Sequence, residues 1–153
     1  MKNKTVIQID TREKSTDHIK DVFISKNVKF VSSKLLAGDY MNWDNPRIVV
    51  ERKNSILELA NTVGAQHERF KAELKMSTDY GLKIIILVEE DGFFCLEDLK
   101  EWVNPFQTKN PRAMSGKTLY KILSRYLEYY DVEIEFCSKL DAGQRIIELL
   151  RAT

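Results

Sequence analysis

The feature that most constrains the fold is an apolar run in the middle of the chain, from Leu82 to Val88, interrupted only by Lys83. Gly81 precedes the run and acidic residues follow it. A short apolar run with these borders is typical of a β-strand that is buried on both faces. A sheet built around such a strand needs helices on each of its sides.

Strand and helix patterns alternate along the rest of the chain. We expect further strands at residues 5–9, 28–32 and 132–136, and helices at residues 16–27, 55–76, 96–103, 116–130 and 142–150. Ser55 and Ser115 are good helix N-caps, and Gly64 is a candidate break in the longest helix. The alternation predicts an α/β fold, a mixed central sheet flanked by helices, and a length of 153 residues fits a single domain of residues 1–153.

The stretch GDYMNWDNPRIVVERK, residues 38–53, predicts a β-hairpin. A turn at residues 44–46 separates two β-prone runs, and the second run is rich in β-branched residues. Side chains alternate along a strand, so we expect Glu51 and Lys53 on one face and Arg52 on the other. Asp39, at the far end of the hairpin, can then lie opposite Glu51.

Two carboxylates and an ammonium group on one face, with the Arg52 carbonyl nearby, are a donor set that suits Mg²⁺. Such an ion stabilises charge on a phosphodiester, and Lys53 would orient the nucleophile or neutralise developing charge. Alternating charges also occur on any solvated hairpin. The pattern by itself favours that solvated surface, and the other stretches of the chain have to decide between the two.

GDY followed by VERK resembles the signature of the XPF-type structure-specific endonucleases, and three other stretches agree in the same order. They are IQIDTREK at residues 7–14, ERFKAEL at residues 68–74 and KIIILVEE at residues 83–90. The resemblance implies a restriction-endonuclease-like core. It also implies a Mg²⁺-dependent DNA endonuclease, with Mn²⁺ able to substitute, that acts at branched, flap or junction DNA.

The resemblance further implies which side chains form the site. The catalytic set would be Asp10, Glu13, Asp39, Glu51, Arg52 and Lys53, with Asp39 and Glu51 as the metal ligands. Arg12 and Arg52 would contact phosphate or brace the carboxylates. Arg69 would reach a phosphate from its helix, although a solvated Arg69 paired with Glu73 is an alternative.

Three positions depart from the family pattern. Leu57 stands where the family usually has an aspartate, residues 67–68 replace an Asp-Gly pair, and Glu73 replaces a glutamine. These departures concern the geometry and the substrate preference more than the metal ligands.

Residues 104–126 contain five basic side chains and no Asp or Glu. In a chain of net charge +1, this segregation predicts a positive surface suited to DNA phosphates, with Lys109, Arg112 and Lys117 as contacts. The alternative is a solvated helix face preceded by a basic loop. Residues 115–118 are similar to the end of a nucleotide-binding loop, but Pro111 stands where that motif needs glycine, so we expect no nucleotide cofactor.

Cys95 and Cys137 have apolar neighbours and no metal-ligand spacing, so we expect buried free thiols in a reducing compartment. The chain starts without an apolar signal segment, and its longest apolar run is too short to span a bilayer. These observations predict a cytoplasmic protein, or a nuclear one in a eukaryote, without a membrane partner.

DNA is the expected partner. The family's helix-hairpin-helix modules have no counterpart in the sequence, so specificity would come from the basic segment, from a homodimer or from a partner protein. A non-catalytic DNA-binding or scaffold subunit that pairs with an active nuclease is a second hypothesis. Such partners lose the carboxylate and lysine that Glu51 and Lys53 supply here, which favours the enzyme. A nuclease with the same core that cuts RNA or plain duplex is a third hypothesis.

Overall fold

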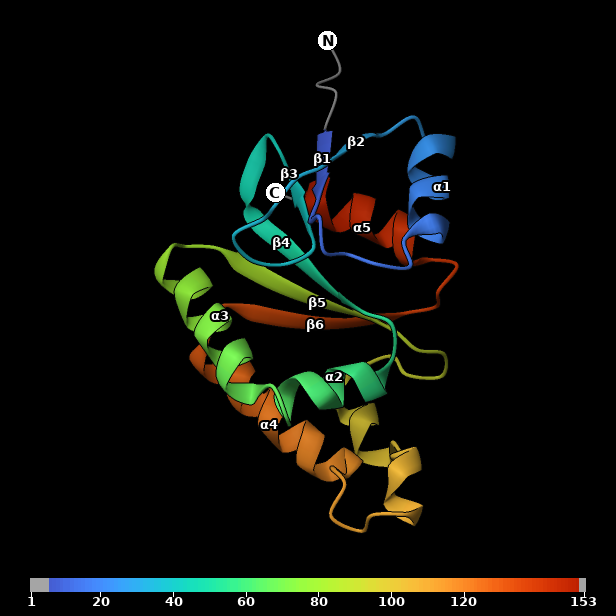
Figure 1. Ribbon diagram of the computed structural model, residues 1–153, viewed down its shortest axis with the longest axis vertical. Helices are drawn as coiled ribbons and strands as arrows, with labels where there is room; N and C mark the ends of the chain where they lie inside the picture. The colour runs from blue at the N-terminus through green and yellow to red at the C-terminus, as the bar shows by residue number, and fades with distance from the viewer. Residues whose placement is uncertain (1–5, 152–153) are drawn as a thin grey trace.

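The computed structural model describes residues 6–151, in which six strands form one mixed sheet in the order β2-β1-β3-β4-β5-β6 (Figure 1). β3 runs antiparallel to both β1 and β4, whereas the remaining neighbours are parallel. The strands are β1 (Val6–Ile9), β2 (Lys29–Ser32), β3 (Tyr40–Asn42), β4 (Asn45–Lys53), β5 (Lys83–Glu89) and β6 (Val132–Cys137). The expected fold class and the hairpin of β3 and β4 are therefore confirmed. Thr5, which the first predicted strand includes, lies outside the described residues.

The helices are α1 (Asp17–Ser25), α2 (Ile56–Val63), α3 (His67–Asp79), α4 (Gly116–Tyr129) and α5 (Ala142–Arg151), with short 3-10 helices η1 (Leu96–Glu101) and η2 (Pro105–Thr108). The predicted helix at residues 55–76 is two helices, because the backbone leaves the helical conformation at Gly64. The segment predicted as a helix at residues 96–103 is the shorter η1. Within residues 6–151, no helix has the length and apolar character needed to cross a membrane.

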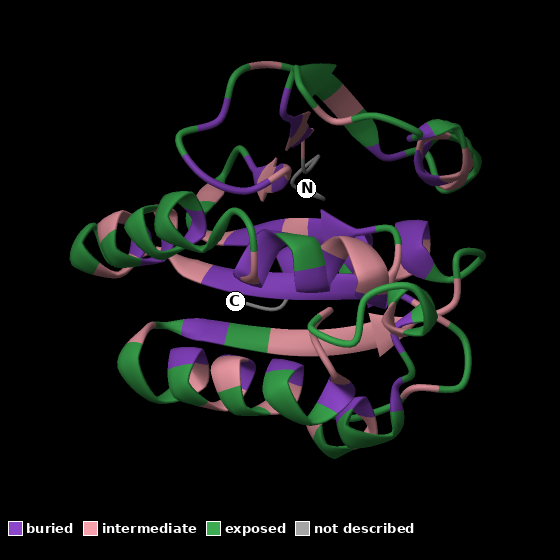
Figure 2. Cartoon of the chain, turned by 60° about the horizontal axis from the view of Figure 1, so that its bottom comes forward, coloured by how far each residue is buried: buried purple, intermediate pink, exposed green. Residues whose placement is uncertain are grey.

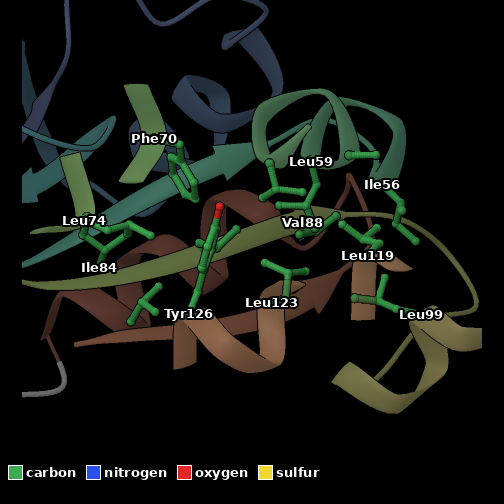
Figure 3. Packing of buried hydrophobic residues seen from close by; sticks show 14 of the residues in the cluster. Ile56, Leu59, Phe70, Leu74, Ile84, Val88, Leu99, Leu119, Leu123 and Tyr126 are labelled. Atoms are coloured by element: carbon green, nitrogen blue, oxygen red, sulfur yellow. The ribbon is translucent and has the colours of Figure 1, made fainter. Parts of the chain in front are cut away.

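Helices cover both faces of the sheet and enclose two apolar clusters. α1 and α5 pack on one face, and α2, α3 and α4 pack on the other (Figure 1). Figure 2 shows the buried residues concentrated in the central strands and on the helix faces turned toward them. In the cluster of Figure 3, side chains from α2, α3 and α4 gather around β5.

β5 is buried on both faces, as the apolar run predicts. Ile84 and Ile86 belong to the cluster under α2, α3 and α4, while Ile85 belongs to the cluster under α1 and α5. β4 alternates in the same way, with Val49 in the first cluster and Val50 in the second. This alternation directs the side chains at the C-terminal end of β4 toward opposite layers.

The basic segment is held closely against the α2–α4 layer at the start of α4. A Cβ at Gly116 would overlap the main-chain carbonyl of Leu99 and lie 2.7 Å from that of Trp102. Only glycine permits this approach of α4 to η1. Ser115 caps the helix, since its Oγ accepts a 3.2 Å hydrogen bond from the Thr118 N–H.

The expectation of two buried thiols is wrong. Cys137 is only half-buried in β6, and Cys95 is exposed. Cys95 occupies the N-cap position of η1, where the chain enters a surface turn, and the apolar character of its neighbours Phe93 and Phe94 does not reflect burial there.

Candidate active site

The turn into β3 places Asp39 beside the C-terminal end of β4. Gly38 adopts φ +74°, and a Cβ there would lie 3.0 Å from Cβ of Val49, so both the backbone and the space require glycine. The Asp39 N–H donates a 2.8 Å hydrogen bond to the Val50 carbonyl, and the Arg52 N–H donates one of 2.8 Å to Asp39 Oδ2. These bonds seat the Asp39 carboxylate next to the segment that carries Glu51.

The two carboxylates are held in an environment that disfavours their charge. Burial raises the pKa of Asp39 to about 7, and the charge of Glu13 adds to the effect. Burial also raises the pKa of Glu51 well above its usual range, with further contributions from the charges of Asp39 and Glu73. The Lys53 ammonium opposes the rise but does not offset it.

Lys53 lies in the same layer as Glu51, on the α2–α3 side of β4. Its Nζ is 3.2 Å from Glu51 Oε1 and 5.9 Å from the centroid of the Phe70 ring. The side chain is 7% exposed. The ammonium group is therefore restrained beside the carboxylate pair rather than free in solvent.

Arg52 points to the opposite layer, where its guanidinium is fully engaged. Nε donates to Glu13 Oε2 at 2.9 Å, Nη1 to Glu89 Oε1 at 2.7 Å, and Nη2 to the carbonyls of Lys14 and Ser15 at 2.6 and 3.3 Å. The residue is 5% exposed. These contacts tie the loop after β1 to the ends of β4 and β5, so Arg52 braces the site.

Asp10 is buried and accepts hydrogen bonds from the loop after β1 and from the loop between β2 and β3. It accepts a 2.9 Å bond from Nε of Arg12 and another of 2.9 Å from the Leu35 N–H. Burial alone would raise the pKa of Asp10, but the hydrogen bonds from Arg12 and Leu35 hold it below its usual range. The Asp10 N–H also donates to the Asp39 carbonyl at 2.8 Å, which connects β1 to the turn.

Two clefts meet at the carboxylate pair. The larger, of about 590 Å³, is lined by the site residues and the start of α2, namely Arg12, Glu13, Asp39, Glu51, Arg52, Lys53 and residues 54–61 in part. The smaller, of about 300 Å³, includes Asp10, Gly38, Arg69 and Glu73 and shares Arg12, Asp39 and Glu51 with the larger. Arg12 and Arg69 thus lie near the two carboxylates, within reach of a bound anion.

The structure does not bring the predicted basic contacts into this site. Lys109 follows η2, Arg112 lies in the next loop, and Lys117 lies in the first turn of α4. All three are exposed. Arg112 lines a separate groove between α2 and the loop before α4, so these residues form a second region rather than part of the carboxylate site.

Two acidic residues that the sequence pattern did not identify support the site. Glu73 Oε1 accepts a 3.0 Å hydrogen bond from the Gly38 N–H and so anchors the turn, instead of pairing with Arg69. Glu89, one of the acidic residues that follow the apolar run, is 5% exposed and binds Arg52. The strand register explains this contact, because Arg52 pairs with Leu87 and Glu89 lies on the same face of β5 as Leu87.

The residues present fit a divalent cation. Among residues 6–151, Asp39 accepts only from the Arg52 N–H and Glu51 only from Lys53, which leaves one oxygen of each carboxylate for a ligand. The positive charge of a bound cation would also compensate for the burial and the like-charge repulsion that raise both pKa values. No cluster of three or more His, Cys, Asp or Glu side chains suited to metal is formed within this range. A pair completed by waters and substrate phosphate matches the requirements of Mg²⁺.

Comparison with protein families shows that the ERCC4 domain model matches residues 9–150. No curated protein matches the chain. The match covers the sheet from the last residue of β1 onward, both helical layers and every side chain of the site described above.

Solved structures of XPF from Aeropyrum pernix share the fold. One aligns with a TM-score of 0.68 at 18% identity and covers 95% of this chain and 63% of that structure's chain. Another, titled as a complex with DNA, aligns with a TM-score of 0.67 at 19% identity and covers 96% of this chain and 64% of the other. The chain spans less than two thirds of the length of either protein. At this identity the likeness concerns the fold.

Proposed function

The chain belongs to the ERCC4 domain family of XPF-type nucleases, and from this membership we propose that it is a metal-dependent DNA endonuclease that cuts at branched, flap or junction DNA. The observation that carries the proposal is the pair of Asp39 and Glu51, both half-buried, with the ammonium group of Lys53 beside it. Like charges that are partly withdrawn from water are costly to a fold, and they recur where a protein performs chemistry.

Asp39 and Glu51 would hold the cation, with the Arg52 carbonyl as a further oxygen donor. When bound, Mg²⁺ or Mn²⁺ supplies positive charge at the phosphodiester and assists the attack of water. Lys53 places a fixed positive charge at the same point, 3.2 Å from Glu51, where it can orient the nucleophile and stabilise charge that develops on the phosphate.

Arg12 and Arg69 are suited to the phosphates next to the cleaved bond. Both line the smaller cleft together with the carboxylate pair. Their guanidinium groups form paired hydrogen bonds with phosphate oxygens. Asp10, Glu13 and Arg52 act indirectly, since their mutual contacts keep the loop after β1 in place.

DNA as the substrate is supported by the relative from Aeropyrum pernix, which is described in complex with DNA. The positive surface of residues 104–126 would extend the contact away from the cleft. Selection among DNA structures would draw on that surface and on a second copy or a partner protein.

The test is a cleavage assay on single-stranded, duplex, flap, fork and four-way DNA with Mg²⁺, Mn²⁺ or EDTA. We expect metal-dependent cleavage of at least one branched substrate and its loss in Glu51→Gln. Binding to DNA without cleavage of any substrate would overturn the proposal and favour the scaffold subunit. Preferred cleavage of RNA or of plain duplex would favour the same core with another substrate.

A further inference from the structure

We propose that a groove between α2 and residues 104–115 binds an unpaired stretch of the DNA that the carboxylate site cuts. This inference rests on the proposed function and names the form of the substrate. The groove has a volume of about 630 Å³. The elements that line it, α2, residues 104–115 and the start of α4, lie in the lower half of the molecule in Figure 1.

The groove borders the carboxylate cleft. Leu57 and Asn61 line both spaces. The two residues are four positions apart on α2, so their side chains lie in one row along the helix surface. A strand held at Asp39 and Glu51 can therefore pass over this row and enter the groove without crossing another element.

Phe106 provides an aromatic surface in this groove. Phe106 is 53% exposed, which is high for a large apolar residue. The loop that carries it is tied down by Asn104, whose amide nitrogen donates to the Met114 carbonyl at 3.0 Å and whose Oδ1 accepts from the Phe106 N–H at 3.0 Å. Gln107 adds a 3.2 Å hydrogen bond to the Ala113 carbonyl. The ring is thus held in position before a ligand arrives.

The charge of the groove complements a nucleic acid strand. Arg112 stands at its wall, and neither its lining nor any position in residues 104–126 carries an Asp or Glu. The lining combines this cation with apolar side chains such as Leu57, Met114 and Phe106. A phosphate can pair with the cation while a base stacks on the ring.

The combination favours an unpaired strand over a duplex. In a duplex the faces of the bases are covered by their neighbours in the stack, so a protein surface meets phosphates, sugars and base edges rather than base faces. An apolar floor would then be left facing mostly polar groups. Unpaired bases expose a π-face that every aromatic side chain can accept, and this contact needs no particular sequence.

The test measures binding of a fluorescent twelve-nucleotide dT strand and of a blunt duplex of the same length, by anisotropy in EDTA. Phe106→Ala should weaken binding of the dT strand roughly tenfold, as expected for the loss of one stacked base, and leave duplex binding unchanged. Phe106→Trp should retain the parent affinity. Arg112→Gln should weaken binding of the dT strand, because the strand loses the cation that pairs with one of its phosphates.

Phe94→Ala is the matched control, because Phe94 is 84% exposed and lines a different hollow beside β6. It should bind both DNA forms like the parent. Equal affinity of Phe106→Ala and parent for the dT strand would overturn the inference, as would equal losses in the Phe106 and Phe94 variants. If Phe106→Ala binds the dT strand like the parent and metal-dependent cleavage is intact, only the inference about the groove is contradicted. Phe106-dependent binding without any cleavage contradicts the proposed nuclease alone.

Discussion

The main-chain N–H of Arg52 donates a 2.8 Å hydrogen bond to Oδ2 of Asp39. This bond joins the residue between Glu51 and Lys53 to a carboxylate thirteen positions earlier in the chain. The position of Asp39 is therefore set by the hairpin backbone, which holds its carboxylate beside the segment that carries Glu51.

Neutralising one carboxylate should separate activity from stability. Asp39→Asn and Glu51→Gln should each reduce cleavage by roughly a hundredfold or more, because the proposed ion loses a ligand. Neither should lower the melting temperature of the metal-free protein at pH 8, since each removes a buried charge that its surroundings disfavour. Thermal unfolding and a cleavage assay measure the two effects. A variant that cleaves at the parent rate would exclude that residue as a ligand.

The raised pKa of Asp39 predicts a pH-dependent stability of the metal-free protein. The folded pKa is about 7, whereas an unfolded aspartate titrates near 3.9, so the folded state binds more protons between these values. The stabilising contribution is fully present below about pH 4 and is lost as the pH rises through about 7. The melting temperature in EDTA should fall from pH 5.5 to pH 8.

Asp39→Asn serves as the control for this pH dependence, because it cannot titrate. Its melting temperature should change less over the same range than that of the parent. Excess Mg²⁺ at pH 8 should restore stability to the parent and have little effect on Asp39→Asn, since a ligand stabilises only a protein that binds it. A parent protein whose stability rises between pH 5.5 and 8 would contradict the raised pKa.

Lys53 should affect the rate of cleavage more than the binding of DNA. Its Nζ lies beside Glu51 rather than at the surface, so Lys53→Met should cut the cleavage rate roughly a hundredfold while preserving most of the buried hydrocarbon volume. Binding of a branched DNA with Ca²⁺ in place of Mg²⁺ should stay within about threefold, which corresponds to about 0.7 kcal/mol. Normal cleavage by Lys53→Met would make the lysine a structural residue.

The sequence predicts the face of each residue in β4 because period-two alternation is a local property. Glu51 and Lys53 therefore lie together, and Arg52 lies apart from them, as expected from the residues alone. The two-sided burial of β5 follows equally directly from its composition. The contacts of Arg52 do not follow in this way, because they depend on which strand lies next to β4.

Glu73 and Glu89 show most clearly which contacts the sequence patterns do not predict. Glu73 reaches Gly38 only because α3 packs above the turn into β3, and nothing in the helix pattern specifies that packing. Glu89 becomes buried because β5 pairs in parallel with β4, a non-local relationship. The wrong prediction of burial at Cys95 has a local cause. Cys95 is the N-cap of η1 in a surface turn, and this position exposes it although its neighbours are apolar.

Removing Arg52 should destabilise the protein through the partners it leaves behind. Glu13 would lose its counter-charge and Glu89 would keep only the His18 ring, whose Nε2 is 3.0 Å from Glu89 Oε1, and stranding charges in this way typically costs about 3–5 kcal/mol. Arg52→Met should therefore lower the free energy of unfolding in urea by about this amount. Adding Glu89→Gln should recover part of the loss, because the second change removes one of the two stranded charges. Equal stability of the single and double variants would mean that Glu89 is accommodated by other contacts.

The exposed cations of the basic segment should control the salt dependence of DNA binding. Each phosphate contact lowers log affinity by about 0.9 per unit of log salt on duplex, so replacing Lys109, Arg112 and Lys117 by Ala should reduce the slope by about two to three units. The carboxylate cleft lies elsewhere, and cleavage at saturating DNA and low salt should approach the parent rate.

Lys121 then distinguishes the loop from the helix as the contact surface. Lys117, Lys121 and Arg125 are exposed at successive four-residue steps along α4, so they form one stripe on the outside of the molecule. If the duplex lies along α4, adding Lys121→Ala to the triple variant should lower the slope by about one further unit. If DNA touches only the loop before α4, the fourth change should leave the slope of the triple variant as it is. An unchanged slope in the triple variant itself would show that the segment is a solvated surface, and the duplex path would then have to run past Arg12 and Arg69, which line the smaller cleft together with the carboxylate pair.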